Sequence, residues 1–277
     1  MTALLQTTDV VRQFGGKRPW FGAARPGVRA VDGVTLAVPR GRTLGIVGES
    51  GCGKSTLARM MVGLLAPTSG DIAIEGRSVA EFAKRDRKAL RRKVQMVFQD
   101  PFGSLNPRKT VRQILETPLA ALHAMPAAAR RARVAELMGL VSLRREFAER
   151  YPHEFSGGQC QRIGIARALA AEPELIVLDE PVSALDVSVQ AQVLMLLAEL
   201  QRRLNLTYVF ISHDLAVVET ISDEVAVMYR GKVVERGPRG EIFAAPQHEY
   251  TRLLMASVPG AGGSQPHEEG RAGKCGR

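Results

Sequence analysis

Residues 48–56, GESGCGKST, are the stretch whose residue types and spacing point most directly to chemistry. They fit the phosphate-binding loop pattern G-x-x-x-x-G-K-[ST], in which glycines let successive backbone N–H groups turn toward phosphates. Lys54 would reach the terminal phosphates, and the Ser55 hydroxyl would bind Mg²⁺. The residues predicted to bind the nucleotide here are Gly48, Glu49, Ser50, Gly51, Cys52, Gly53, Lys54, Ser55 and Thr56.

Apolar segments flank this loop on both sides. Residues 43–47 (TLGIV) have the composition of a short buried strand, and residues 57–65 (LARMMVGLL) continue as an apolar helix. The N-terminus of a helix adds the positive end of its dipole to an anion site. A strand, a glycine loop and a helix in this order predict a nucleotide site.

Polar side chains also follow the other predicted core strands at the point where each strand ends. They are Gln99 after VQMVF, Asp179 and Glu180 after LIVL, and His213 after TYVFI. Strands that alternate with helices form a largely parallel sheet, and ligands bind at the carboxyl ends of its strands. We therefore expect these side chains to converge on the phosphates held by Lys54.

The side chains at the strand ends suit phosphoryl transfer to water, which depends on positioning and charge stabilisation. Asp179 can hold Mg²⁺ directly or through water, and Glu180 can polarise the attacking water. The imidazole of His213 and the amide of Gln99 supply the remaining polar groups. Glu180, His213 and Gln99 are thus the predicted catalytic residues.

The rest of the chain indicates further elements around this core. Residues 1–14 and 28–47 alternate in short segments typical of strands, and a loop rich in Gly, Pro and Arg separates them. Residues 110–150 follow a helical period, which predicts an inserted helical subdomain. Residues 225–236 read as a hairpin that turns at Arg230-Gly231, and the residues from about 260 onward are expected to be disordered.

Composition limits the class of protein. The chain has 277 residues and a formal net charge of +10, which suits an anionic partner such as nucleic acid or the cytoplasmic face of a membrane. We expect neither a membrane span nor a secretory signal, because long apolar runs are missing. The densest basic run, residues 84–93, is interpreted as a solvated helix face rather than a binding patch.

The sequence allows two interpretations each for Phe14 and Cys52. Phe14 could stack on an adenine ring or be an ordinary core residue of its strand, and Trp20 or Phe21 could compete for the stacking role. Cys52 lies where a helix N-terminus and Lys54 could lower its pKa, although a small residue that merely fits is favoured. Cys52, Cys160 and Cys275 are far apart in the sequence and do not have the spacing of a metal site, which fits a protein of a reducing compartment.

A second loop, FSGGQ at residues 155–159, opens another predicted helix with Ser156 at the N-cap position. Together with GESGCGKST, Gln99, LIVLDEP, SALD and His213, this order resembles the ATP-binding-cassette ATPases over residues 4–258. VFQDPFGSLNPRKTV, RYPHEFSGGQ, DEPVSALDVSVQAQV and YVFISHDLAVVE are similar to the ATPase subunits of dipeptide, oligopeptide and nickel importers, specifically the F-type subunit.

The resemblance implies a role for each motif residue. Phe14 would stack on adenine, Gln99 would sense Mg²⁺, and Asp179 and Ser55 would support Mg²⁺. Glu180 would be the general base and His213 would contact the γ-phosphate. A hydroxyl, glycine N–H groups and a helix N-terminus form a second anion site, which would close over ATP held by a partner chain. Its residues are Ser156, Gly157, Gly158 and Gln159, and Asp186 would stabilise the interface.

The resemblance also implies an α/β fold: a RecA-like P-loop NTPase core with an antiparallel β subdomain and an inserted α-helical subdomain. The expected boundaries are 1–98 and 171–258 for the core with its β subdomain, 99–170 for the helical subdomain and 259–277 for a disordered tail. The chain departs from the family at Phe155, where leucine is usual, and at Glu249, where proline is usual. An iron–sulfur centre is unsupported, because only Cys275 stands where many relatives carry a cysteine cluster.

We therefore expect an ATPase that drives import of dipeptides or oligopeptides, with ATP and Mg²⁺ as cofactors, at the cytoplasmic face of the inner membrane. Its expected partners are a second ATPase subunit in a heterodimer, two integral membrane permeases and an extracytoplasmic binding protein. We expect contact with anionic membrane lipid and none with nucleic acid. Nickel or another small solute is the alternative cargo, and a soluble ATPase of DNA repair or translation is a distant alternative.

Overall fold

A six-stranded sheet forms the centre of the computed structural model, which describes residues 3–15 and 27–256. Its strands run in the order β10-β9-β3-β8-β7-β6, and neighbours are parallel except for the antiparallel pair β9 and β10. The apolar runs of β3, β7 and β8 are buried along their whole length, as expected of parallel strands covered on both faces. The strands span β3 Thr43–Val47, β6 Val94–Val97, β7 Leu175–Asp179, β8 Thr207–Ser212, β9 Glu224–Tyr229 and β10 Lys232–Pro238.

A second, antiparallel sheet has the order β2-β1-β4-β5. Its strands are β1 Ala3–Phe14, β2 Val28–Pro39, β4 Ser69–Ile74 and β5 Arg77–Ser78. Leu57, Met60 and Met61 of helix α1 (Lys54–Met61) are fully buried in a core shared by the two sheets. Hydrophobic burial on α1 therefore joins the two sheets and fixes the residues that precede it.

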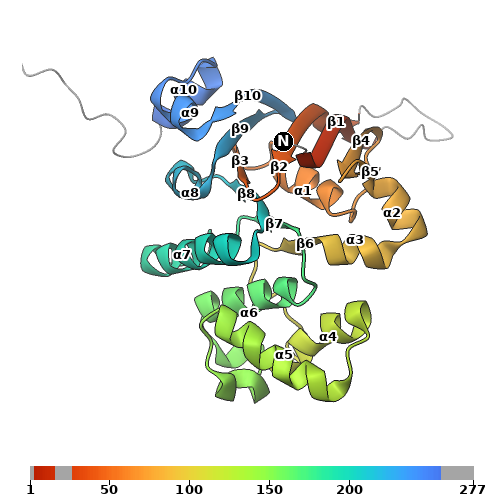
Figure 1. The fold of residues 1–277 in the computed structure, drawn as a ribbon. Helices are drawn as coiled ribbons and strands as arrows, with labels where there is room; N and C mark the ends of the chain where they lie inside the picture. The colour runs from red at the N-terminus through yellow and green to blue at the C-terminus, as the bar shows by residue number, and fades with distance from the viewer. Residues whose placement is uncertain (1–2, 16–26, 257–277) are drawn as a thin grey trace, which may run out of the picture.

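The segment between β6 and β7 holds the helices α4 (Val111–His123), α5 (Ala127–Leu140) and α6 (Gly157–Leu169) and two short 3₁₀ turns. Figure 1 shows these helices gathered at the end of the molecule opposite α9 (Arg239–Ala244) and α10 (Glu249–Ala256). The residues predicted to form apolar helix faces are all buried: Val111, Ile114, Leu115, Val134, Leu137, Met138 and Val141. The helical period of this segment is thus confirmed.

One local prediction about a helix end was wrong. Helix α1 ends at Met61 instead of residue 65, because Gly63 turns the chain at φ +72° and leaves Leu64 exposed. The basic run, residues 84–93, is helical and mostly exposed, as predicted, and is divided between α2 (Val79–Arg85) and α3 (Arg87–Lys93). Asp86 breaks the run, since its carboxylate accepts a hydrogen bond from the Ala89 N–H and caps α3.

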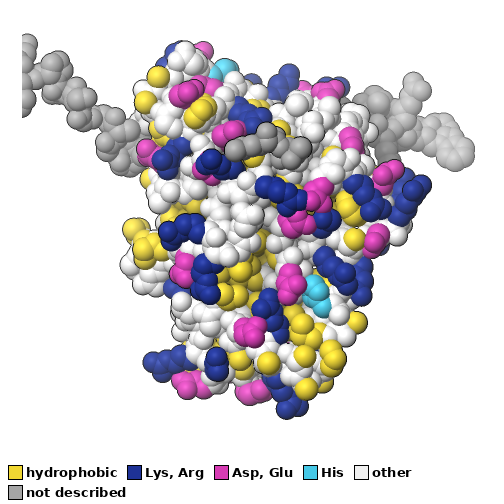
Figure 2. Space-filling model, viewed as in Figure 1, with side chains coloured by type: hydrophobic (Ala, Val, Ile, Leu, Met, Phe, Trp, Pro, Cys, Tyr) yellow, Lys and Arg dark blue, Asp and Glu magenta, His cyan; other side chains and the backbone are white. Residues whose placement is uncertain are grey.

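The remaining helices of the described chain are α7 (Val187–Leu204) and α8 (Leu215–Ile221). Within residues 3–15 and 27–256, none of the helices is both long and apolar enough to cross a bilayer. On the face in Figure 2, Lys and Arg side chains are spread among acidic ones. The predicted disordered tail, Trp20, Phe21 and Cys275 lie outside the described residues.

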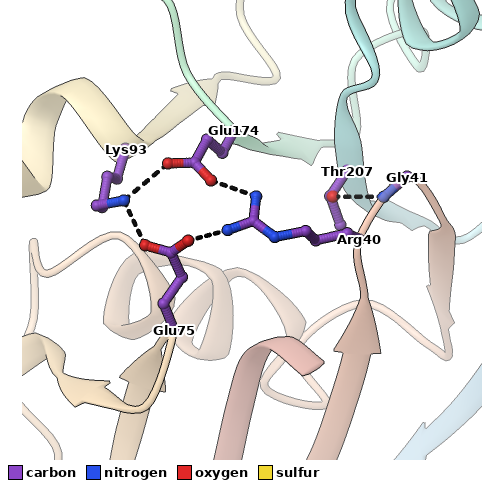
Figure 3. A network of polar contacts seen from close by, with 6 residues as sticks. All are labelled: Arg40, Gly41, Glu75, Lys93, Glu174 and Thr207. Atoms are coloured by element: carbon purple, nitrogen blue, oxygen red, sulfur yellow. Dashed lines mark hydrogen bonds and ion pairs between the residues drawn. The ribbon is translucent and has the colours of Figure 1, made fainter. Parts of the chain in front are cut away.

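A closed ring of four charged side chains connects the two sheets (Figure 3). Arg40 bonds to both Glu75 and Glu174, and Lys93 bonds to the same two carboxylates, with 2.7 Å between Lys93 Nζ and Glu174 Oε1. Burial raises the pKa of Glu174, but the hydrogen bonds from Lys93 and Arg40 outweigh it and hold this pKa below its ordinary value. The ring joins the turn after β2, the turn after β4, the end of α3 and the residue before β7.

We expect Glu174→Gln to lower the free energy of unfolding by about 0.5–1 kcal/mol at pH 7, because a third of the carboxylate is exposed and water screens its ion pairs. A carboxyl whose pKa is lowered by folding stabilises the protein above its unfolded pKa, and loses this effect as the pH falls through its folded pKa. The difference from wild type should therefore shrink in urea titrations taken from pH 7 to below pH 4.

Glu199→Gln, in the exposed pair with Arg203, is the matched control and should change stability little at any of these pH values. A loss for Glu174→Gln that is the same at every pH would assign the effect to packing instead of charge.

Candidate active site

The loop of residues 48–53 connects β3 to α1 and packs against neighbouring backbone so closely that only glycine fits at two positions. A Cβ on Gly48 would lie 2.2 Å from the Met228 carbonyl oxygen, and one on Gly53 would lie 2.0 Å from that of Ala30. Gly53 also has φ +111°, a left-handed value. The glycines thus serve close packing as well as the turn.

The Lys54 side chain is 4% exposed and lies back along this loop. Its ammonium donates to the carbonyl oxygens of Gly48 at 2.6 Å and Glu49 at 2.8 Å. Carbonyl dipoles solvate the charge without neutralising it, so a net positive charge remains for an anion. Lys54 thereby supplies the electrostatic centre of the site.

A cavity of about 590 Å³ opens beside the loop. The part of its wall around Gly51 is open, because a Cβ there would meet no atom within 4 Å. The lining residues are Ala30, Gly48, Glu49, Ser50, Gly51, Gly53, Lys54, Ser55, Thr56, Gln99, Glu180, His213 and Leu254. A cavity of this size, lined by the glycine loop and by Lys54, fits a nucleotide with its phosphates.

Asp179 and Ser55 lie together next to the cavity. The Ser55 hydroxyl donates to Asp179 Oδ1 at 2.9 Å, and Asp179 is 5% exposed. Burial raises the pKa of Asp179, although the hydrogen bond from Ser55 opposes the rise. A buried carboxylate beside a hydroxyl is a set of hard oxygen ligands that suits Mg²⁺.

Glu180, Gln99 and His213 come together at the carboxyl ends of the strands. The same oxygen of Glu180, Oε2, lies 2.9 Å from Gln99 Nε2 and 3.2 Å from His213 Nδ1. Glu180 takes φ +48°, which is rare for a residue with a side chain, and its N–H donates to the Ile211 carbonyl oxygen. Backbone in this region is typical of functional sites, where surrounding structure maintains the strain.

The FSGGQ loop lies elsewhere. Ser156 caps α6 in a reciprocal pair, since its hydroxyl accepts from the Gln159 N–H while the Gln159 amide oxygen accepts from the Ser156 N–H. Ser156, Gly158 and Gln159 line a separate cavity of about 360 Å³, and Gly158 touches Val189 so closely that a Cβ would lie 2.4 Å from it. The N-cap position of Ser156 is confirmed, but the structure does not bring this loop to the Lys54 cavity.

Asp186 is an exposed residue at the N-cap of α7, and no hydrogen bond from its side chain caps that helix. Phe14 ends β1 with 42% of its surface exposed, outside the lining of the Lys54 cavity, and the Arg12 guanidinium lies 4.8 Å from its ring centroid. The reading of Phe14 as a core residue is therefore wrong. Its stacking role stays a prediction.

Of the two readings of Cys52, the alternative with a lowered pKa is wrong. Burial raises the pKa of its thiol, and the nearby charge of Lys54, whose Nζ is 3.8 Å from Cys52 Sγ, only partly offsets this. The reading as a small buried residue that fits is the one that agrees with the structure.

Three residues of this site were missed in the sequence. The Ala30 carbonyl borders Gly53, Leu254 lines the cavity, and the Tyr250 hydroxyl accepts a hydrogen bond from the Glu49 N–H at 3.1 Å. Each reaches the loop from a distant part of the chain. Glu249, the neighbour of Tyr250, was noticed in the sequence only as a departure from the family, and nothing in the local pattern pointed to the loop.

The parallel sheet, the glycine loop before α1 and the buried lysine define a P-loop nucleotide-binding protein. The ABC transporter family model matches residues 31–183. The chain belongs to the ABC transporter family, whose ATP-binding proteins are ATPases, so ATP is its nucleotide and ATP hydrolysis its reaction.

Curated relatives are similar in sequence to this chain over most of its length. It is 52% identical to the oligopeptide transport ATP-binding protein AppF of Bacillus subtilis, covering 92% of this chain and 78% of the relative. It is 50% identical to the dipeptide transport ATP-binding protein DppF of Escherichia coli, covering 92% and 76%.

Solved structures share the fold. A dimeric post-hydrolysis structure of the ATP-binding cassette MJ0796 with ADP and Pi is 29% identical, with a TM-score of 0.73 over 85% of this chain and 98% of that one. The cbiO1 structure from Clostridium perfringens is 27% identical, with a TM-score of 0.75 over 94% and 97%. The predicted fold class is thus confirmed.

Gly53→Ala should lower the free energy of unfolding by at least about 3 kcal/mol, because a methyl group at φ +111° would also collide with the Ala30 carbonyl. Gly51→Ala is the matched control: it has φ +82° but open space, so about 1 kcal/mol is expected. Denaturant unfolding without nucleotide measures both. Equal losses would show that backbone strain alone, without the collision, explains the need for glycine.

Proposed function

We propose that the chain is the ATP-hydrolysing subunit of an importer for dipeptides or oligopeptides. The observation that carries the hydrolytic part is the Glu180 carboxylate held between Gln99 and His213 at the cavity of Lys54. The transport part is supported by relatives at 50–52% identity whose names are dipeptide and oligopeptide transport ATP-binding proteins.

In this proposal Glu180 is the general base that accepts a proton from the attacking water. Its second oxygen, Oε1, is free of the contacts with Gln99 and His213 described above, which both involve Oε2. His213 and Gln99 orient the carboxylate, and His213, more than half exposed, also reaches the γ-phosphate. Ser55, Asp179 and Gln99 would hold Mg²⁺, which when bound neutralises charge on the phosphates.

We further propose that the site is completed by a second ATPase chain. Lys54 and the Ser156 loop line different cavities, although both are suited to an anion. Two chains arranged head to tail would bring the Ser156, Gly157, Gly158 and Gln159 loop of one to the ATP of the other. Asp186 stands at the start of α7, close in sequence to Leu185 and Val189, which lie against Gly157 and Gly158, and it would contact the partner. Phe14 would stack on adenine.

Coupling to transport would use the boundary between the core, residues 1–98 and 171–258, and the helical subdomain, residues 99–170. A cavity of about 360 Å³ lies on this boundary and is lined by Gln95, Asn106 and Leu122 among others. It adjoins the segment that begins at Gln99, so a permease helix seated there could respond to the state of the site. Two permeases, an extracytoplasmic binding protein and a peripheral position on the anionic inner membrane complete the proposal.

Glu180→Gln should bind ATP but reduce its turnover at least about 100-fold, because an amide cannot accept the proton. Glu219→Gln, an exposed acid on the neighbouring helix α8, is the control and should hydrolyse ATP normally. Phosphate release and ATP binding, measured on the same preparations, test whether turnover is lost while binding is kept. Near-normal turnover by Glu180→Gln would overturn the assignment of the general base.

The transport proposal is tested by purifying the tagged chain from detergent-solubilised membranes of its own cells and identifying the bound proteins by mass spectrometry. Two permeases, a second ATPase and a peptide-binding protein are expected. Recovery of nucleic-acid or ribosomal proteins from the soluble fraction, with no permease, would show that the proposal is wrong.

A further inference from the structure

Helix α10 reaches the phosphate-binding loop from the far end of the described chain. Its Tyr250 is 7% exposed, and the Tyr250 hydroxyl accepts a hydrogen bond from the Glu49 N–H at 3.1 Å. This N–H belongs to the loop but is directed at Tyr250. One backbone donor is thus used to hold the loop from outside.

The peptide unit that Tyr250 holds is the one that receives Lys54. The N–H of Glu49 and the carbonyl of Gly48 are two ends of one peptide bond, and that carbonyl accepts from Lys54 Nζ at 2.6 Å. A trans peptide is planar, so its N–H and C=O point in opposite directions. A hydroxyl that fixes the N–H therefore also fixes the oxygen that orients the ammonium group.

Tyr250 is itself held firmly. Its ring centroid lies 4.2 Å from that of Tyr229, at the end of β9, and its N–H donates to His248 Nδ1 at 3.1 Å. The Glu235 carboxylate on β10 accepts hydrogen bonds from the N–H groups of Gln247 and His248, just before α10. The hydroxyl therefore has a defined position relative to the sheet.

The turn between β9 and β10 is hydrogen-bonded to the same loop at a second point. The Gly231 N–H donates to the Cys52 carbonyl oxygen at 2.9 Å. Backbone groups at Glu49 and Cys52 are thus bound from the outer side, while the side around Gly51 remains open to the cavity. The outer support comes from elements near the end of the chain, about 180 to 200 residues from the loop.

We propose that Tyr250 is a positioning residue for ATP: its hydroxyl fixes the Gly48–Glu49 peptide and thereby the Lys54 ammonium, so that α10 sets the affinity of the site for nucleotide. The inference concerns nucleotide binding by an ABC ATPase and holds whatever solute is transported. It assigns to α10 a part in the active site instead of a purely structural one.

The test is Tyr250→Phe, which keeps the ring and removes only the hydroxyl. ADP in the presence of Mg²⁺ is the probe, titrated by calorimetry, because it is not hydrolysed and retains the phosphates nearest the loop. Losing one hydrogen bond should weaken ADP binding about two- to tenfold. The KM for ATP should rise by a similar factor, while kcat at saturating ATP changes less than about twofold.

Tyr229→Phe is the matched control, since Tyr229 is the other ring of the tilted pair and the described residues provide no hydrogen-bond partner for its hydroxyl. Its affinity for ADP should equal that of wild type. The binding stoichiometry in each titration reports the folded fraction separately from the affinity. Unchanged ADP affinity in Tyr250→Phe, or equal weakening in both variants, would overturn the proposal.

A double-mutant cycle with Lys54→Arg tests the route through the lysine. Arginine keeps the charge but cannot make the same contact with the Gly48 carbonyl. If Tyr250 acts through that carbonyl, Tyr250→Phe should change ADP affinity less than about twofold in the Lys54→Arg background. The same two- to tenfold weakening in both backgrounds would show that the hydroxyl acts elsewhere.

Discussion

The burial of the Lys54 ammonium is the interaction on which the rest of the site depends. A charged group that leaves water must find polar partners, and a carboxylate partner would have cancelled the attraction for phosphate. The chain instead provides carbonyl oxygens of Gly48 and Glu49, which stabilise the cation and leave its charge in place. Those oxygens are available because the loop bends tightly. The absence of side chains at Gly48 and Gly53 lets this bent loop pack against the carbonyl groups of Met228 and Ala30.

Features encoded by short stretches of residues were predicted well from the sequence. The glycine loop, the capping residue Ser156, the apolar faces of α4 and α5 and the polar residues at strand ends depend on spacing alone, which can be read along the chain. Contacts between distant residues that do not follow from the order of strands in a parallel sheet were not. Tyr250 meets Glu49 across 201 positions, and no local pattern points from one to the other. Cys52 shows the same limit for electrostatics, because the cost of its burial is a property of the packed core.

The Lys54 loop and the Ser156 loop differ in what supports them. The Lys54 loop is bound from outside by β2, β9 and α10, so it belongs to the sheet and is held by several elements. The Ser156 loop is supported mainly by its own helix, through the reciprocal hydrogen bonds with Gln159, and by contacts with α7 through Val189. A first loop held by the sheet and a second loop carried on the helical segment are compatible with the contact between chains proposed above, which would form and break.

Two connections join the sheet to the segment that holds α4, α5 and α6, and only one of them is anchored by the ring of Arg40, Glu75, Lys93 and Glu174. The chain returns to the sheet at Glu174, whose side chain is tied into the ring and whose N–H donates to the Lys93 carbonyl oxygen. The outgoing connection, from Phe98 to Thr110, is a series of turns held by the hydrogen bonds of Gln99 to Glu180 and of Arg167 to the Ser104 carbonyl oxygen, with no ion pair among its described residues. Any rotation of the helices would pivot about the tethered return strand, and the displacement would be greatest along the outgoing side, where Gln99 touches Glu180.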